Sequence, residues 1–350
     1  MKESPSALIK WLDRDFYKLG AFLTSYDGKE VVFAKGGSFT IVEEFLEIPS
    51  PIFYLKDFYH NRYLAYSPAE TIKVSRDEIT LPEEEPQHFS PLSNDDDLYQ
   101  KDFGLLESAF GSDLQKVVLI SRETYEPFEE EKTIIHLMKK AFSLGSGIPY
   151  GFWNSQYGVI GSTPELLFDV QNEVLNTYAL AGTAKSGQEQ NLLESAKDRH
   201  EHNLVIQDIQ EKLANFSSQI ETSPTHIHSF KSIIHLRTDI EAKVSPDTNY
   251  TALTNTLSPT AALGGYPKLE SLNFLRGSHY GRKYSERYFG SALGLMSQET
   301  KEFIVSIRNV QWEGHHLFIE SGGGVVSESV FEKELDEIHL KRNTIRKHYL

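Results

Sequence analysis

The chain has 350 residues, enough for roughly two average domains, and 39% of them are hydrophobic, so it can build a sizeable core. Its 35 Lys and Arg against 50 Asp and Glu give a net charge of −15, which argues against general binding to nucleic acid or to an anionic membrane. Cysteine is absent, which excludes disulfides, thiolate metal sites and a cysteine nucleophile. The N-terminus does not resemble a signal peptide and no apolar run is long enough to span a bilayer, so we expect a cytoplasmic protein.

Hydrophobic spacing predicts the secondary structure in chain order. The expected elements are a helix over 7–17, strands over 30–34 and 39–42, a helix over 98–109, a strand over 116–121, a hairpin over 150–162, strands over 166–170 and 174–181, a helix over 189–216, strands over 233–238, 290–296, 302–310 and 316–321, and a helix from 329 to the C-terminus. Hairpins mixed with separate helices favour an α+β fold.

We expect one large unit in which two lobes, each of sheet and helix, enclose the site. The only linker-like stretch, 82–97, holds two acidic runs that we interpret as solvated loop. Residues 1–97 are therefore predicted to be an N-terminal segment packed on the same unit, and residues 98–350 the main domain.

The last predicted helix carries Glu334, Glu337 and Lys341 on one stripe, because positions i, i+3 and i+7 share a helix face. Apolar residues adjoin the stripe, which indicates that it lies at the edge of the buried surface. Two like charges beside a core need compensation, and a divalent cation would supply it. The alternative is a solvated face stabilised by Glu–Lys pairing.

Two further segments offer groups that could bind a ligand, a glutamate in the helix predicted over 189–216 and a run of glycines after the strand predicted over 316–321. Glu201 heads an apolar stripe on its helix, and buried Glu is rare without a partner, so it is a better ligand candidate than its neighbours. Three glycines at 322–324 follow a strand, and their backbone N–H groups can approach an anion closely. A plain turn from strand to helix explains the glycines equally well.

Lys116 and Glu165 have surroundings that would allow proton transfer, although local sequence alone singles out neither residue. Lys116 begins an otherwise apolar strand, where a lysine usually reaches to the surface. If it points inward instead, desolvation lowers the pKa of a lysine and makes it a usable general base. Glu165 lies where two strands meet, and a carboxyl shielded there can stay protonated as a general acid.

Eight motifs follow one another in the order found in the chorismate-utilising enzymes, which the chain resembles over about residues 100–350. The motifs are Lys116-Val-Val-Leu-Ile-Ser-Arg122, Ser162-Thr-Pro-Glu-Leu166, Leu180-Ala-Gly-Thr183, Lys197-Asp-Arg-His-Glu-His202, Leu257-Ser-Pro-Thr-Ala-Ala-Leu-Gly264, Ile307-Arg308, Gly322-Gly-Gly-Val-Val326 and Glu334-Leu-Asp-Glu-Ile-His-Leu-Lys341. The histidine-rich motif and the strand led by lysine are most similar to isochorismate synthases of menaquinone or siderophore biosynthesis.

The resemblance implies a Mg²⁺-dependent isomerase that converts chorismate to isochorismate. Lys116 would activate a water for attack at C2, and Glu165 would protonate the departing C4 hydroxyl. The implied metal ligands are Glu201 and Glu337, with Glu334 close to the metal. The implied substrate-binding residues are Gly182, Thr183, Arg308, Gly323 and Lys341. No obligate protein partner is implied.

Two alternatives stay open. Salicylate synthases share the lysine and the glutamate but also eliminate pyruvate, and a degenerate, non-catalytic protein would only bind chorismate. Two positions bear on the choice within the family. Ala181 stands where aminodeoxychorismate synthases have a nucleophilic lysine, which argues against that activity, and Ser258 stands where the family usually has histidine, which bears on substrate positioning.

Overall fold

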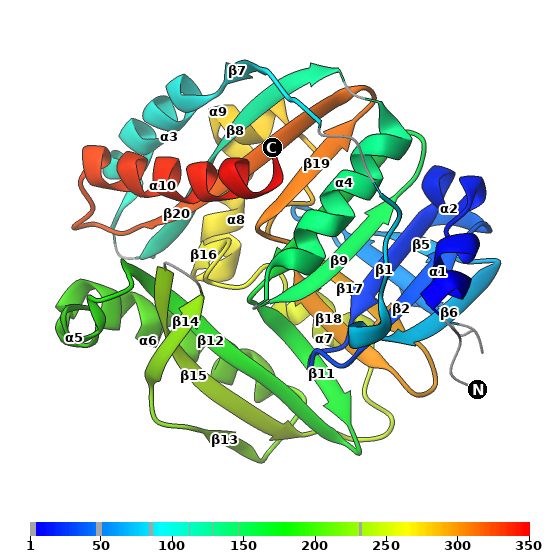
Figure 1. Cartoon of the computed structure of the whole chain (residues 1–350). Helices are drawn as coiled ribbons and strands as arrows, with labels where there is room; N and C mark the ends of the chain where they lie inside the picture. The colour runs from blue at the N-terminus through cyan, green and yellow to red at the C-terminus, as the bar shows by residue number, and fades with distance from the viewer. Residues whose placement is uncertain are drawn as a thin grey trace.

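A computed structural model describes residues 5–46, 51–83, 87–111, 113–127, 129–145, 147–230 and 233–350 (Figure 1). Within these residues the chain forms two antiparallel ten-stranded sheets with helices packed on them. The predicted α+β fold is therefore confirmed. No helix in this part of the chain is long and apolar enough to cross a membrane.

Sheet A contains the strands that carry Lys116 and the three glycines. In spatial order its strands are β16 (Gly265–Tyr266), β8 (Lys116–Pro127), β20 (His316–Val325), β19 (Asn309–Glu313), β10 (Tyr157–Thr163), β9 (Ile148–Trp153), β1 (Gly20–Thr24), β2 (Glu30–Lys35) and β6 (Glu70–Ser75), and β7 (Pro91–Asn94) also pairs with β8.

Sheet B lies against sheet A and contains the strand with the Ala-Gly-Thr motif. In spatial order its strands are β13 (Ile220–Thr222), β15 (Ile233–Lys243), β12 (Val174–Lys185), β11 (Leu166–Gln171), β18 (Lys301–Val305), β17 (Ala292–Met296), β4 (Ile52–Lys56), β5 (Tyr63–Ser67) and β3 (Ser38–Val42), and β14 (His226–Phe230) also pairs with β15.

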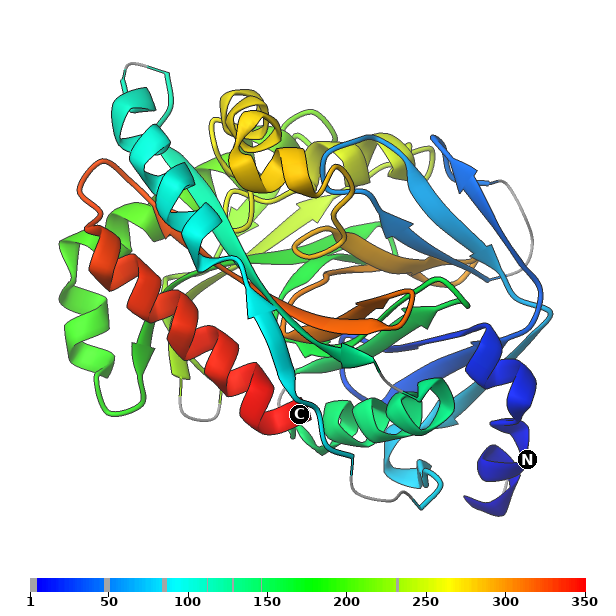
Figure 2. The ribbon, with the colours of Figure 1, turned by 90° about the horizontal axis from the view of Figure 1, so that it is seen from above.

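Ten helices in the described part of the chain surround the two sheets (Figure 2). They are α1 (Pro5–Trp11), α2 (Arg14–Lys18), α3 (Asp96–Ala109), α4 (Glu130–Ser143), α5 (Glu189–Glu194), α6 (Ala196–Leu213), α7 (Tyr250–Leu257), α8 (Lys268–Gly277), α9 (His279–Lys283) and α10 (Phe331–Tyr349), with a 3-10 turn at Arg76–Glu78. Helices α3, α4 and α10 pack on sheet A, and α6 packs on β12 of sheet B.

Side-chain alternation along the strands divides the core between these layers. On β1, Phe22 packs into the cluster beneath α4, and its neighbours Ala21 and Leu23 pack into the cluster between the sheets. Successive residues of a strand point to opposite faces, so one buried strand serves two cores. This explains why many strands here read as continuous apolar runs.

Several predicted elements differ from the observed ones. The single helix predicted over 189–216 is two helices, because Ser195 is extended and its side chain caps α6 by accepting from the Asp198 N–H. The strand predicted over 302–310 is interrupted between β18 and β19 by Arg308, which has a left-handed backbone at φ 53°.

The acidic run at Asn94–Asp97 is not the solvated loop that we predicted. Asp95 is buried and accepts from Lys283 Nζ at 2.7 Å, and Asp96 accepts from Arg342 Nη1 and Nη2 at 3.0 Å each. Part of the other acidic run, 84–86, lies outside the described residues. The run at 94–97 therefore anchors α3 to α9 and α10.

The first 97 residues contribute strands to both sheets. Strand β1 pairs with β9 of sheet A, and β4 pairs with β17 of sheet B. The boundary between an N-terminal segment of 1–97 and a domain of 98–350 stays a prediction.

Candidate active site

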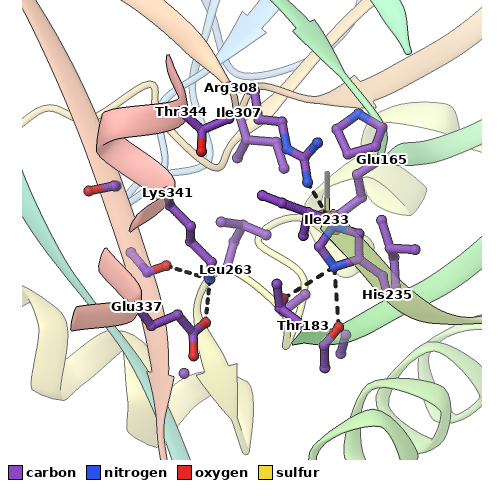
Figure 3. Close-up of a pocket in the computed structure, with 18 of the residues that line it drawn as sticks. Glu165, Thr183, Ile233, His235, Leu263, Ile307, Arg308, Glu337, Lys341 and Thr344 are labelled. Carbon is purple, nitrogen blue, oxygen red and sulfur yellow. Dashed lines mark hydrogen bonds and ion pairs between the residues drawn. The ribbon is translucent and has the colours of Figure 1, made fainter. Parts of the chain in front are cut away.

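A pocket opens where β20 and α10 of the sheet A side meet β12, β15 and α6 of the sheet B side (Figure 3). Seven of the ten predicted site residues line it. They are Glu165, Gly182, Thr183, Glu201, Arg308, Glu337 and Lys341. These residues come from positions up to 176 apart in the chain (341 − 165), so only the tertiary fold brings them together.

The other three predicted residues lie directly behind this lining. Lys116 is fully buried, and its Nζ lies 2.9 Å from Glu201 Oε1. Gly324 keeps this contact open to the pocket, because a Cβ there would lie 2.6 Å from Lys116 Cε. Glu334 is also buried, and its Oε2 would lie 3.8 Å from a Cβ on Gly323.

Glu165 lies in the short connection between β10 and β11 and is almost fully buried. Burial raises its pKa to about 7, against the lowering effects of a hydrogen bond from Thr260 and of the charges of Lys116, Arg308 and Lys341. The Thr260 hydroxyl donates to Glu165 Oε1 at 3.3 Å. A carboxyl in this state can carry a proton near neutral pH.

The three predicted metal-ligand glutamates each contact a lysine. Glu201 pairs with Lys116 at 2.9 Å, Glu334 with Lys197 at 2.9 Å, and Glu337 with Lys341 at 2.7 Å. Burial alone would raise the pKa of Glu337, but Lys341, Lys197 and Lys116 hold it below its ordinary value. In contrast to Glu165, this carboxyl is an anion at neutral pH.

The donor set suits a hard divalent cation. Glu201, Glu337 and Asp198 line one pocket and offer only oxygen ligands, and Mg²⁺ is commonly held by one or two carboxylates together with waters and an anionic substrate. Among the described residues, no three His, Asp or Glu side chains converge into a complete metal cage. A bound Mg²⁺ would therefore share these carboxylates with the lysines and take further ligands from water or substrate.

His235 on β15 is a pocket residue that the sequence analysis missed. Its Nε2 lies 2.7 Å from Arg308 Nη2, and its Nδ1 lies 3.2 Å from both the Gly182 carbonyl oxygen and Thr183 Oγ1. Burial and the charge of Arg308 hold the pKa of His235 well below its ordinary value, so the ring is neutral and its Nε2 accepts from Arg308. A buried polar residue within the apolar run 233–236 was the available signal.

A bulge in β12 shapes the wall opposite α10. The pairing of β12 with β15 shifts register between Ala181 and Thr183, and Gly182 between them has φ 74°. This conformation favours glycine, and a Cβ there would approach Asp198 Cβ to 3.2 Å. The bulge leaves Gly182 and Thr183 in the lining of the pocket that also holds Arg308 and Lys341.

Comparison with known proteins gives a consistent result. A sequence model of the family described as chorismate binding enzyme matches residues 71–348. Isochorismate synthase MenF of Haemophilus influenzae is 27% identical over 239 residues, which cover 65% of this chain and 55% of that protein. The vibriobactin-specific isochorismate synthase of Vibrio cholerae is 29% identical over 256 residues, which cover 69% of this chain and 63% of that protein.

The fold also has solved counterparts. The structure of MenF, the menaquinone-specific isochorismate synthase from Escherichia coli, aligns with a TM-score of 0.83 at 19% identity, over 98% of this chain and 91% of that one. In sequence, the chain spans only about half the length of the curated relatives that it matches.

Proposed function

The chain belongs to the family of chorismate-binding enzymes, and from this premise we propose that it is an isochorismate synthase. The proposed reaction adds water at C2 of chorismate and removes the C4 hydroxyl, so the product is an isomer of the substrate. The observation that carries the proposal is Glu165, a pocket carboxyl whose pKa burial raises to about 7. Binding alone does not require such a group, but protonation of a leaving hydroxyl does.

Lys116 is the proposed general base and Glu165 the proposed general acid. Lys116 takes a proton from the attacking water, whose oxygen bonds to C2. The ring double bonds shift, and the C4 hydroxyl leaves as water with the proton of Glu165. Lys116 is fully buried behind the pocket lining, beside Glu201. The proposal places the substrate ring between Lys116 and Glu165.

Cations at the pocket account for recognition of a dianion by an acidic protein. Arg308 and Lys341 are the proposed partners of the two substrate carboxylates, together with the backbone at Gly182, Thr183 and Gly323. Desolvation lowers the pKa of Arg308 to about 10, and its side chain still carries its charge at neutral pH. A partly desolvated charge of this kind is stabilised by an anionic ligand.

We propose Mg²⁺ as the cofactor, held by Glu201 and Glu337 with Glu334 close by. When bound, it would neutralise these carboxylates and supply positive charge for an anionic substrate. Two of the lysines that pair with these glutamates also have a proposed role in the reaction. Lys116, which pairs with Glu201, is the proposed base, and Lys341, which pairs with Glu337, is a proposed substrate ligand.

The isochorismate would supply menaquinone or siderophore synthesis in the cytoplasm, which agrees with relatives named for menaquinone and for vibriobactin. The test is to incubate purified protein with chorismate, with and without Mg²⁺, and to separate the products by chromatography. Isochorismate as the only Mg²⁺-dependent product supports the proposal. Salicylate with pyruvate would make the enzyme a salicylate synthase, and no turnover would leave chorismate binding alone.

A further inference from the structure

Arg308 holds its side chain in the pocket from a backbone conformation that non-glycine residues rarely adopt. Its φ is 53°, in the left-handed region, and its guanidinium contacts His235 at 2.7 Å. Such a conformation is strained in a residue other than glycine and persists only where the surrounding structure holds it. The contacts on either side of Arg308 therefore bear on its function.

Tyr150 fixes the residue before Arg308, and Asn309 fixes Tyr150. The Tyr150 hydroxyl donates to the Ile307 carbonyl at 2.9 Å, and Asn309 Nδ2 donates to the Tyr150 oxygen at 2.7 Å. Asn309 Nδ2 also lies 3.2 Å from Ser306 Oγ. The backbone on both sides of Arg308 is thus tied to one buried tyrosine.

The network continues to a buried ion pair. Gln311 Nε2 donates to Asn309 Oδ1 at 3.2 Å and to Glu320 Oε2 at 3.0 Å. Arg122 Nη2 donates to Glu320 Oε1 at 2.9 Å, and the rings of Tyr284 and Phe318 each lie 3.8 Å from the Arg122 guanidinium carbon. Glu320 itself lines the pocket, so the network forms part of one wall.

Gly161 on the neighbouring strand leaves room for this arrangement. It pairs with Asn309, and a Cβ there would lie 2.8 Å from the Arg308 carbonyl oxygen and 2.6 Å from Asn309 Cβ. Real Cβ atoms do not approach so closely, so a side chain at this position would displace Arg308 or Asn309. The absence of a side chain at Gly161 therefore allows the left-handed backbone of Arg308 to pack against the neighbouring strand.

We propose that the network of Glu320, Gln311, Asn309 and Tyr150 is a positioning device that holds Arg308 in its left-handed conformation and so aims its guanidinium at a substrate carboxylate. The inference rests on the proposed function, because it takes Arg308 as a ligand of chorismate. Tyr150 is a positioning residue, since it acts through Arg308 and does not line the pocket.

The test is Tyr150→Phe, which removes one hydroxyl and keeps the buried ring. We expect KM for chorismate to rise about tenfold, the worth of one buried hydrogen bond, with kcat within about threefold of wild type. Tyr66→Phe is the matched control, because the Tyr66 hydroxyl also donates to a backbone carbonyl, that of Leu19, at 3.3 Å and outside the pocket. It should leave KM unchanged.

A double-mutant cycle separates positioning from general loss of structure. In an Arg308→Ala background, Tyr150→Phe should no longer raise KM, because the group that it positions is gone. If Tyr150→Phe raised KM equally in both backgrounds, or if Tyr66→Phe raised KM as much as Tyr150→Phe, the inference would be overturned. Turnover by the wild type would still support the proposed function.

The cycle remains decisive if the wild-type protein does not turn chorismate over. The proposed function then fails, and the same four proteins are compared by calorimetric Kd for chorismate. Loss of the Tyr150→Phe effect in the Arg308→Ala background supports the positioning role in binding. Absence of chorismate binding by the wild type would overturn it.

Discussion

Glu165 and Glu337 are two glutamates of one pocket that lie on opposite sides of it, in different electrostatic surroundings (Figure 3). Glu165 lies in a dry corner where burial raises its pKa to about 7. Glu337 pairs with Lys341 at 2.7 Å, its side chain is 31% exposed, and its pKa lies below the ordinary value. The same residue type is therefore suited to donate a proton on one side and to bind a cation on the other.

We expect the largest effect from a variant that removes the proton of the Glu165 carboxyl. Glu165→Gln keeps the shape of the side chain but cannot donate a proton, so we expect kcat to fall by at least about a hundredfold, with chorismate binding largely kept. Steady-state kinetics and calorimetry measure the two effects. Lys116→Ala should lower kcat to a similar extent, because it removes the proposed base that takes a proton from the attacking water.

Glu302→Gln is the control for a general effect of altering a buried glutamate. Glu302 lies on β18, outside the pocket lining, and burial raises its pKa to about 8. Like Glu165, it is a buried glutamate with a raised pKa, but it lies away from the pocket. Its variant should therefore keep kcat near the wild-type value. Equal losses in the two variants would remove Glu165 from the proposed chemistry.

On the side of the pocket where Glu337 pairs with Lys341, Glu337→Gln should weaken Mg²⁺ binding by at least about tenfold, because one anionic ligand is lost. Calorimetric titration with MgCl₂ measures this without turnover. Glu328→Gln removes an exposed charge just before α10 and should leave the affinity unchanged. If both variants bind Mg²⁺ as tightly as wild type, Glu337 is not a ligand.

Helix α10, which carries Glu337 and Lys341, is held to the rest of the fold by the contact of its Arg342 with Asp96. Burial would raise the pKa of Asp96, but Arg342, Ser121 and His339 lower it to about 2. A depressed carboxyl pKa stabilises the fold above about pH 4, and this contribution is lost as the pH falls toward 2.

Asp96→Asn should therefore lower the free energy of unfolding at neutral pH by about 1–2 kcal/mol, after allowance for solvent screening. Urea denaturation at pH 7 and at low pH would show the difference between variant and wild type shrinking with acid. Asp97→Asn, at an exposed pair with Lys101, should change stability by less than about 0.5 kcal/mol. A larger cost for Asp97→Asn than for Asp96→Asn would contradict this assignment.

The smallest expected effect is a change in the pKa of Glu165. Glu165 must be protonated, so kcat/KM should fall as the pH rises through about 7. The Thr260 hydroxyl favours the charged carboxylate, so Thr260→Val should raise the pKa of Glu165 and move this limb to higher pH by about half a unit. Thr254→Val, which removes a hydroxyl bonded to the Tyr250 carbonyl, should not move it. A shift to lower pH would contradict the assignment of this limb to Glu165.

The sequence was informative where a residue conflicts with its local pattern. Glu201 heads an apolar stripe and lines the pocket, and Lys116 opens an apolar strand and contacts Glu201 from behind the lining. Asp96 gave the opposite impression, because an acidic run usually faces solvent, and its partner Arg342 lies 246 positions away. The conformation of Arg308 and the contact of His235 with it likewise arise from tertiary packing, which no local spacing reports.

The origin of the oxygen at C2 of the product shows whether water is added as proposed. Chorismate would be converted with Mg²⁺ in water enriched in ¹⁸O, and the product identified by chromatography and mass spectrometry. We expect isochorismate that carries one solvent oxygen at C2, with the C4 oxygen released. Isochorismate without solvent ¹⁸O, or no isochorismate at all, would rule out the proposed reaction.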